Sequence, residues 1–176
     1  MTTRTAETSS LIYARVAGFT FLFYIAAGIT SLALAGRTNV TDVLSLLTSF
    51  SALVLGVTLY MITREQGPAL AMLALTCRVL EAVSGEAAIF FAVGSLLFSW
   101  LLLRGRLIPV ALAWLGVLAS SLWVVGLPLQ IVGVLPDSVT WLMYLPMAAF
   151  EIPLGLWLLI KGVAMPTPNI AASGAD

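Results

Sequence analysis

Long apolar stretches, separated by short polar or glycine- and proline-containing breaks, run along the chain. A helix that crosses the hydrocarbon core of a bilayer needs roughly 20 mostly apolar residues. The pattern therefore predicts an all-α, polytopic integral membrane protein with six transmembrane helices, at about residues 16–35, 43–63, 69–84, 86–103, 110–134 and 141–160. We interpret residues 1–176 as a single six-helix membrane domain, in which residues 163–176 form a flexible C-terminal tail.

Local residues indicate helix starts and bends. Thr41 and Asp42 supply an N-cap and a first-turn acid for the second helix. Proline removes a backbone donor and clashes with the preceding helical turn. We therefore expect helix five to be kinked at Pro128 and helix six to be kinked at Pro146 and Pro153.

The stretch from residue 69 to residue 103 is too long for one membrane helix, because at 1.5 Å per residue it would measure roughly 50 Å. It divides most naturally at Ser84-Gly85-Glu86, where Glu86 belongs to the outer turn. Short cytoplasmic loops collect Lys and Arg, so the charges can decide between five and six helices.

Six helices with the N-terminus inside place most loop cations on the cytoplasmic side and only Arg37 outside. The cytoplasmic cations are then Arg4, Arg15, Arg64, Arg104, Arg106 and Lys161. Five helices would leave no such bias. We therefore predict six spans with both termini inside.

The first apolar stretch could also be a secretory signal, since Arg4 and Arg15 precede it and Ala33-Leu34-Ala35 resembles a cleavage site. A signal h-region usually has about 7 to 15 apolar residues, and this stretch is longer. Its length favours a retained helix.

The second, fourth and sixth helices end alike, with an aromatic residue four positions before a cation, then Gly and Pro. The aromatic and cation pairs are Tyr60 with Arg64, Trp100 with Arg104, and Trp157 with Lys161. A triplicated hairpin, as in transporters built from repeats, is one reading. The other is the general chemistry of an inward helix end, with a headgroup-level aromatic, a snorkelling cation and a glycine cap. The helix interiors contain no matching repeat, which favours the second reading.

Composition supports a membrane protein and excludes other classes. The chain is 61% hydrophobic and 9% charged, its mean hydropathy is +1.09 and its net charge is zero. This composition excludes a nucleic-acid binder, a disulfide-stapled secreted domain and a disordered tail. With no histidine and one cysteine, the chain offers no histidine-ligated metal or haem site and no intrachain disulfide. We expect no cofactor and no metal.

Three ionisable residues fall inside predicted spans, namely Arg78, Glu81 and Glu151. A charge at the centre of a membrane helix costs about 2.5 to 3.5 kcal/mol, so such groups need partners or a wet cavity. Arg78 and Glu151 both fall close to the midplane when depth is counted along their helices. Arg78 and Glu81 are three residues apart and share a helix face. We therefore predict a buried cluster in which Arg78 lies between Glu81 and Glu151.

This cluster has one carboxylate in excess, and two carboxylates that share one cation in a low dielectric do not both ionise readily. One of them is expected to hold a proton. The cluster is either a charged clasp that fixes the packing of helices three and six, or a ligand-binding or proton site. Pro146 and Pro153 flank Glu151, and helix breaks beside a midplane charge are a feature of transporter sites.

Other features indicate packing rather than chemistry. Cys77 lies next to Arg78, but a thiol nucleophile usually needs a histidine base and the chain has none. We assign no catalytic residue, and whether the protein is an enzyme stays uncertain, leaning to no. Small residues let helix backbones approach closely, and we expect packing faces at Ala17, Gly18, Ala26, Ala27, Gly28, Gly116 and Ser120.

Four segments carry a resemblance to a known family: Ala14–Gly18, Cys77–Ala82, Leu103–Pro109 and Glu151–Gly162. In their order and sequence they resemble the bacterial membrane family called domain of unknown function 4386. In that family a longer outer segment often separates helices three and four, whereas this chain has only Ser84-Gly85-Glu86. The resemblance implies a six-helix protein of the bacterial inner membrane and brings no activity with it.

Two functions follow from these observations. The first is a carrier or receptor for a small or lipid-like ligand, with Arg78, Glu81 and Glu151 as its polar contacts. The second is a non-catalytic accessory or assembly subunit of a membrane complex, in which the three residues form only a clasp. The expected partners are membrane lipids and either partner subunits or further copies of this chain, and nucleic acid is not among them. The expected location is the bacterial cytoplasmic membrane.

Overall fold

A computed structural model describes residues 2–34, 38–84 and 87–164. These residues form six α-helices and contain no strand. The helices are α1 (Thr2–Ala33), α2 (Thr38–Thr63), α3 (Pro68–Val83), α4 (Ala87–Arg104), α5 (Val110–Ile131) and α6 (Asp137–Ile160). Gly85 and Glu86, at the expected turn between α3 and α4, lie outside the described residues, as do Arg37 and most of the predicted tail.

Two helices begin five or more residues earlier than we expected. Helix α1 begins at Thr2 instead of residue 16, because the polar segment before the apolar stretch contains neither proline nor glycine to stop a helix. Helix α2 begins at Thr38, so Thr41 and Asp42 lie within its first turns rather than at its cap. Both helices therefore extend beyond their apolar stretches.

The three prolines inside helices do not interrupt them. Helix α5 runs through Pro128 and ends at Ile131, shortly before Gly133, whose φ of +76° is the left-handed conformation that ends many helices. Helix α6 continues through Pro146 and Pro153 to Ile160. Both helices are thus continuous through their prolines, and the kinks themselves stay a prediction.

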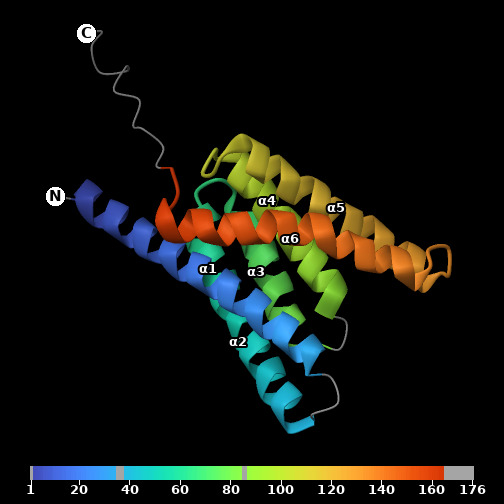
Figure 1. The fold of residues 1–176 in the computed structure, drawn as a ribbon. Helices are drawn as coiled ribbons and strands as arrows, with labels where there is room; N and C mark the ends of the chain where they lie inside the picture. Colours follow the sequence, from blue (N-terminus) through green and yellow to red (C-terminus); the bar gives the residue numbers. More distant parts are fainter. Residues whose placement is uncertain (1, 35–37, 85–86, 165–176) are drawn as a thin grey trace.

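The six helices form a ring in which each packs against its neighbours in the chain and α6 closes back on α1. Helix α2 also touches α4, whereas among the described residues no Cα atom of α3 lies within 8 Å of a Cα atom of α6 or α1. The first residues of α1 and the last of α6 lie toward the same end of the bundle, and α5 and α6 diverge from α1 and α2 toward the other end (Figure 1).

At the end where α2, α4 and α6 finish, the chain is tightly packed. A methyl group on Gly105, just after α4, would lie 2.7 Å from the side chain of Gln66, which follows α2. The backbone N–H of Ala164, beyond α6, donates to the carbonyl of Leu107 at 2.9 Å. We call this the closed end of the bundle. The three cations at this end, Arg64, Arg104 and Lys161, are all exposed.

The outer surface of the bundle is apolar. Four helices contain stretches long and apolar enough to cross a membrane: Thr8–Ala33, Asn39–Thr63, Val110–Ile131 and Trp141–Ile160. In the most apolar part of each, no more than 39% of the residues are buried within the protein. Helices that are apolar on their exposed faces need lipid around them, which supports a membrane-integral protein.

Candidate functional site

A cavity of about 820 Å³ lies between the helices, opposite the closed end. Residues from all six helices line it. They come from the last turns of α1 and α3, the first turns of α2 and α4, the middle of α5, and α6 as far as Glu151. Two carboxyl groups, of Glu81 and Glu151, form part of its wall, and no Lys or Arg side chain does within the part of the chain that the structure describes. The volume is in the range of about 300–1,000 Å³ that is typical of small-molecule sites.

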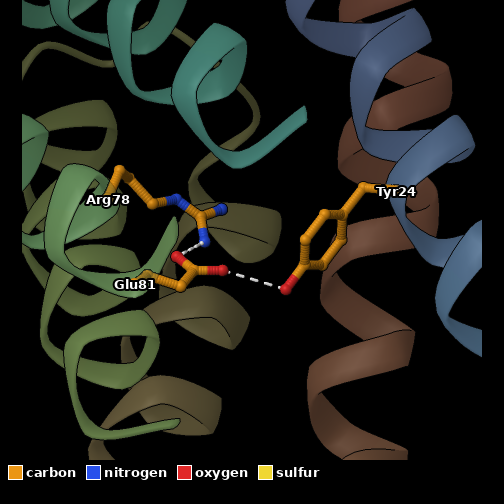
Figure 2. A network of polar contacts seen from close by, with 3 residues as sticks. All are labelled: Tyr24, Arg78 and Glu81. Atoms are coloured by element: carbon orange, nitrogen blue, oxygen red, sulfur yellow. Dashed lines mark hydrogen bonds and ion pairs between the residues drawn. The ribbon is translucent and has the colours of Figure 1, made fainter. Parts of the chain in front are cut away.

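Glu81 connects two helices across the interior of the ring. Its Oε2 accepts a hydrogen bond from Arg78 Nη1 at 2.5 Å on the same helix, and its Oε1 accepts one from the Tyr24 hydroxyl at 2.9 Å. Figure 2 shows the Tyr24 ring pointing from α1 toward the Glu81 carboxylate on α3. Both oxygens of Glu81 therefore have partners, although α1 and α3 are not neighbours in the ring.

Arg78 is almost completely buried, with 1% of its surface exposed. Its guanidinium carbon lies 5.2 Å from the centroid of the Phe91 ring and 6.0 Å from that of Tyr24, within the range of a cation–π contact. It does not line the large cavity. It borders a separate cavity of about 10 Å³ together with Ser95 and Ser99. The ion pair with Glu81 and the two rings thus hold Arg78 behind the cavity wall.

Glu151 is 6% exposed and lies on α6. Its Oε1 has no hydrogen-bond partner, and the structure shows no ion pair between Glu151 and Arg78. The expected position of Arg78 between the two acids was therefore only half correct, because Arg78 pairs with Glu81 alone. The depth argument placed both groups near the midplane, but α3 and α6 lie across the ring from each other.

Aromatic side chains form another part of the cavity wall. The rings of Trp123 and Tyr144 meet edge to face with centroids 4.6 Å apart, and Phe91 meets Trp123 at 6.3 Å. The Trp123 indole N–H donates to the carbonyl of Met143 at 3.0 Å, which fixes its ring against α6. Trp141 contacts Tyr144 from the preceding turn, with centroids 5.5 Å apart. We call Phe91, Trp123, Trp141 and Tyr144 the aromatic wall, and all four line the cavity.

Sequence reasoning missed Tyr24 and the aromatic wall. Tyr24 lies in the middle of an apolar stretch, where its side chain looks like any other large apolar residue. A signal was present, because the hydroxyl of a tyrosine inside a membrane helix needs a partner. The buried acids at Glu81 and Glu151 were the acceptors to consider for it.

The small residues divide into two groups. A Cβ on Gly18 would lie 2.6 Å from the carbonyl oxygen of Gly155, so Gly18 lets α1 pack closely on α6, as we expected. Gly28 was interpreted wrongly, because a Cβ there would meet nothing within 4 Å and Gly28 lines the cavity. Ala26 is exposed and is not part of a packing face within this chain. Glycine at position 28 thus leaves space at the cavity wall.

Cys77 is buried, and its Cβ would lie 3.1 Å from a Cβ built on Gly94 of α4, so it fills a tight contact between α3 and α4. Within residues 2–34, 38–84 and 87–164, no group of three or more His, Cys, Asp or Glu side chains is arranged to hold a metal ion.

One known family matches the chain. The family described as "Domain of unknown function (DUF4386)" matches residues 85–162. The resemblance expected from the sequence is therefore confirmed over this segment, which holds α4, α5, α6 and Glu151. Two of the four resembling segments, Leu103–Pro109 and Glu151–Gly162, lie inside it, whereas Arg78, Glu81 and Tyr24 precede it. No curated protein and no solved structure matches the chain significantly.

Proposed function

We propose that the protein is a carrier or receptor for a small or lipid-like ligand in the bacterial cytoplasmic membrane, and that the ligand occupies the large cavity. The observation that carries this proposal is the cavity itself, whose wall includes Glu81 and Glu151, and one buried carboxyl oxygen of Glu151 has no hydrogen-bond partner among the described residues. A buried carboxyl oxygen without a partner is costly, and a bound polar group would satisfy it. Arg78 acts from behind the wall, where it holds Glu81 in place.

We propose six transmembrane helices with both termini inside. Helix α3 has 16 residues and measures roughly 24 Å at 1.5 Å per residue, less than a bilayer core of about 30 Å. Helices α3 and α4 nevertheless pack in the ring between α2 and α5. If the bundle spans the membrane, these two helices therefore cross the membrane with it. The exposed cations Arg64, Arg104 and Lys161 at the closed end favour that end as cytoplasmic. The cavity then faces the outer half of the membrane.

The clasp alternative loses part of its support. A clasp between helices three and six requires a bond between them, and neither a close helix contact nor an ion pair joins α3 to α6 in the described residues. The contact that does cross the ring joins α3 to α1 through Tyr24. This bond borders the cavity, so it also positions Glu81 for a ligand.

Native mass spectrometry of the full chain, released from lipid nanodiscs, tests the proposal. We expect a peak with the added mass of one bound molecule. The variant Gly28→Leu should lose this peak, because leucine would fill the space at the cavity wall. The matched control Ala26→Leu places the same side chain on the exposed face of the same helix and should keep it.

If neither the wild type nor the control carries a bound small molecule, and both carry partner subunits, the carrier proposal would be overturned in favour of an accessory subunit. A peak that survives Gly28→Leu unchanged would also contradict it, because the ligand would then lie outside the cavity.

A further inference from the structure

The charges at the cavity wall are unbalanced. Glu81 already pairs with Arg78 and accepts a hydrogen bond from Tyr24, so its negative charge is compensated within the protein. In the described part of the chain, Glu151 has no cation within ion-pair distance and its Oε1 has no hydrogen-bond partner, and the residue is more than nine-tenths buried. The cavity therefore has one acidic group without an ion-pair partner in a setting of low dielectric.

The aromatic wall faces the same space. The faces of Trp and Tyr rings carry negative charge density, and they attract organic cations more strongly when water is excluded. Trp123 is 2% exposed and held by its N–H bond to Met143, while Trp141 is 60% exposed beside it. An aromatic wall next to a free carboxyl group is the combination that recognises ammonium groups.

The opposite charge is unsuited to this cavity. Among the described residues no Lys or Arg side chain lines it, and Arg78 is covered by its ion pair and by the rings of Phe91 and Tyr24. A phosphate or a fatty-acid carboxylate would lie near Glu81 and Glu151 with no partner and would be repelled. The wall is otherwise mostly apolar, so the ligand also needs an apolar body.

We propose that the ligand is an amphiphilic organic cation, whose ammonium-type group pairs with Glu151 and packs on the aromatic wall, and whose apolar body fills the rest of the cavity. This inference rests on the proposed function and adds the chemical class of the ligand. Glu151 is the anchoring residue. Glu81, held by Arg78 and Tyr24, adds negative potential without leaving its partners.

Three probes of equal shape and different charge test the proposal, namely tetraphenylphosphonium, tetraphenylsilane and tetraphenylborate. Equilibrium dialysis of the full chain in a neutral maltoside detergent, against detergent alone, measures the binding of each. We expect saturable binding of the phosphonium cation and none of the other two. Glu151→Gln keeps the shape and removes the charge, and it should weaken binding about thirtyfold or more. Glu65→Gln removes an equal charge from the exposed loop after α2 and should leave binding unchanged.

The aromatic wall provides a second, independent measurement in case Glu151→Gln fails to fold. Trp141→Leu should weaken cation binding about two- to fivefold, the size of a partly exposed cation–π contact. The matched control is Trp114→Leu, because Trp114 is 47% exposed on the outside of α5 and does not line the cavity. It should bind as the wild type does.

Equal binding of the three probes, or full binding by folded Glu151→Gln, would overturn the cation inference and leave the proposed function in place. So would binding of the borate or the neutral probe alone. If no probe binds, the cation inference falls as well, and the separate mass measurement on Gly28→Leu decides whether the cavity holds a different ligand.

Discussion

The hydroxyl of Tyr24 donates a 2.9 Å hydrogen bond to Glu81, and this bond joins two helices that do not pack against each other. Helix α2 lies between α1 and α3 in the ring. The bond crosses the interior at the wall of the large cavity, and its acceptor is the carboxylate that also pairs with Arg78. In the described residues the buried ion pair is therefore linked from α3 to α1, and no ion pair joins α3 to α6.

Replacing Tyr24 with phenylalanine removes this bond and keeps the ring. We expect Tyr24→Phe to lower the free energy of unfolding by about 1 kcal/mol, the usual size of an interhelical hydrogen bond in a membrane protein. Tyr13→Phe is the matched control, because the structure shows no hydrogen bond from the half-buried Tyr13 hydroxyl. Reversible unfolding in mixed micelles measures both. Equal losses in the two variants would contradict a role for the Tyr24 bond.

Removing Arg78 leaves the buried Glu81 without its cation. We expect Arg78→Met to lower the free energy of unfolding by about 3–5 kcal/mol, because an uncompensated buried charge costs more than the missing pair. Adding Glu81→Leu removes that charge and should recover most of the loss. Adding Glu151→Leu in its place should not, because Glu151 is not the partner of Arg78. Recovery of stability by Glu151→Leu and not by Glu81→Leu would show that Arg78 pairs with Glu151, which would contradict our account.

The two glycines of α1 should respond differently to the same substitution. At Gly18 a larger side chain would collide with the α6 backbone at Gly155, so we expect Gly18→Leu to lower the unfolding free energy by about 3 kcal/mol. At Gly28 there is open space, so Gly28→Leu should change stability by less than about 1 kcal/mol. Thermal unfolding of the two variants compares them directly. A similar loss at both sites would mean that the cavity is closed at Gly28.

Cysteine labelling tests the proposed topology. Cys77 is buried and should not react, so single cysteines can be introduced into the native background. We expect Asp42→Cys, near the start of α2, to react with a membrane-impermeant maleimide on intact spheroplasts. Lys161→Cys, at the end of α6, should react only after the membrane is opened. Six spans place an odd number of membrane crossings between the two positions, so they should lie on opposite sides. Labelling of both positions from the same side would contradict this topology.

Much of the architecture could be predicted because membrane helices obey a simple length rule. The sequence breaks predicted α3 and α4 to within one residue at each end, and the spacing of Arg78 and Glu81 predicted their contact, since residues three apart share a helix face. The extra turns of α1 could not be predicted from hydropathy. A helix satisfies its own backbone bonds in water as well as in lipid, so its end need not coincide with the membrane surface.

The candidate site was only partly predictable, because depth along a helix says nothing about its place around a ring. Arg78 and Glu151 lie at similar predicted depths, yet their helices are on different sides of the cavity. Gly28 was mistaken for a packing residue because small residues in membrane helices often mark close backbone contacts, as Gly18 does here. The sequence alone does not distinguish a glycine at a helix contact from a glycine at a cavity wall, because the difference lies in the neighbouring helices.

A structure of the full chain in lipid nanodiscs, at a resolution that shows side chains and bound molecules, tests the central claim most directly. We predict an open cavity between the six helices, the Tyr24–Glu81–Arg78 chain at its wall, and density for a bound molecule against the carboxyl group of Glu151. Glu151 in an ion pair with Arg78, with the aromatic wall collapsed into the space between them, would contradict the account.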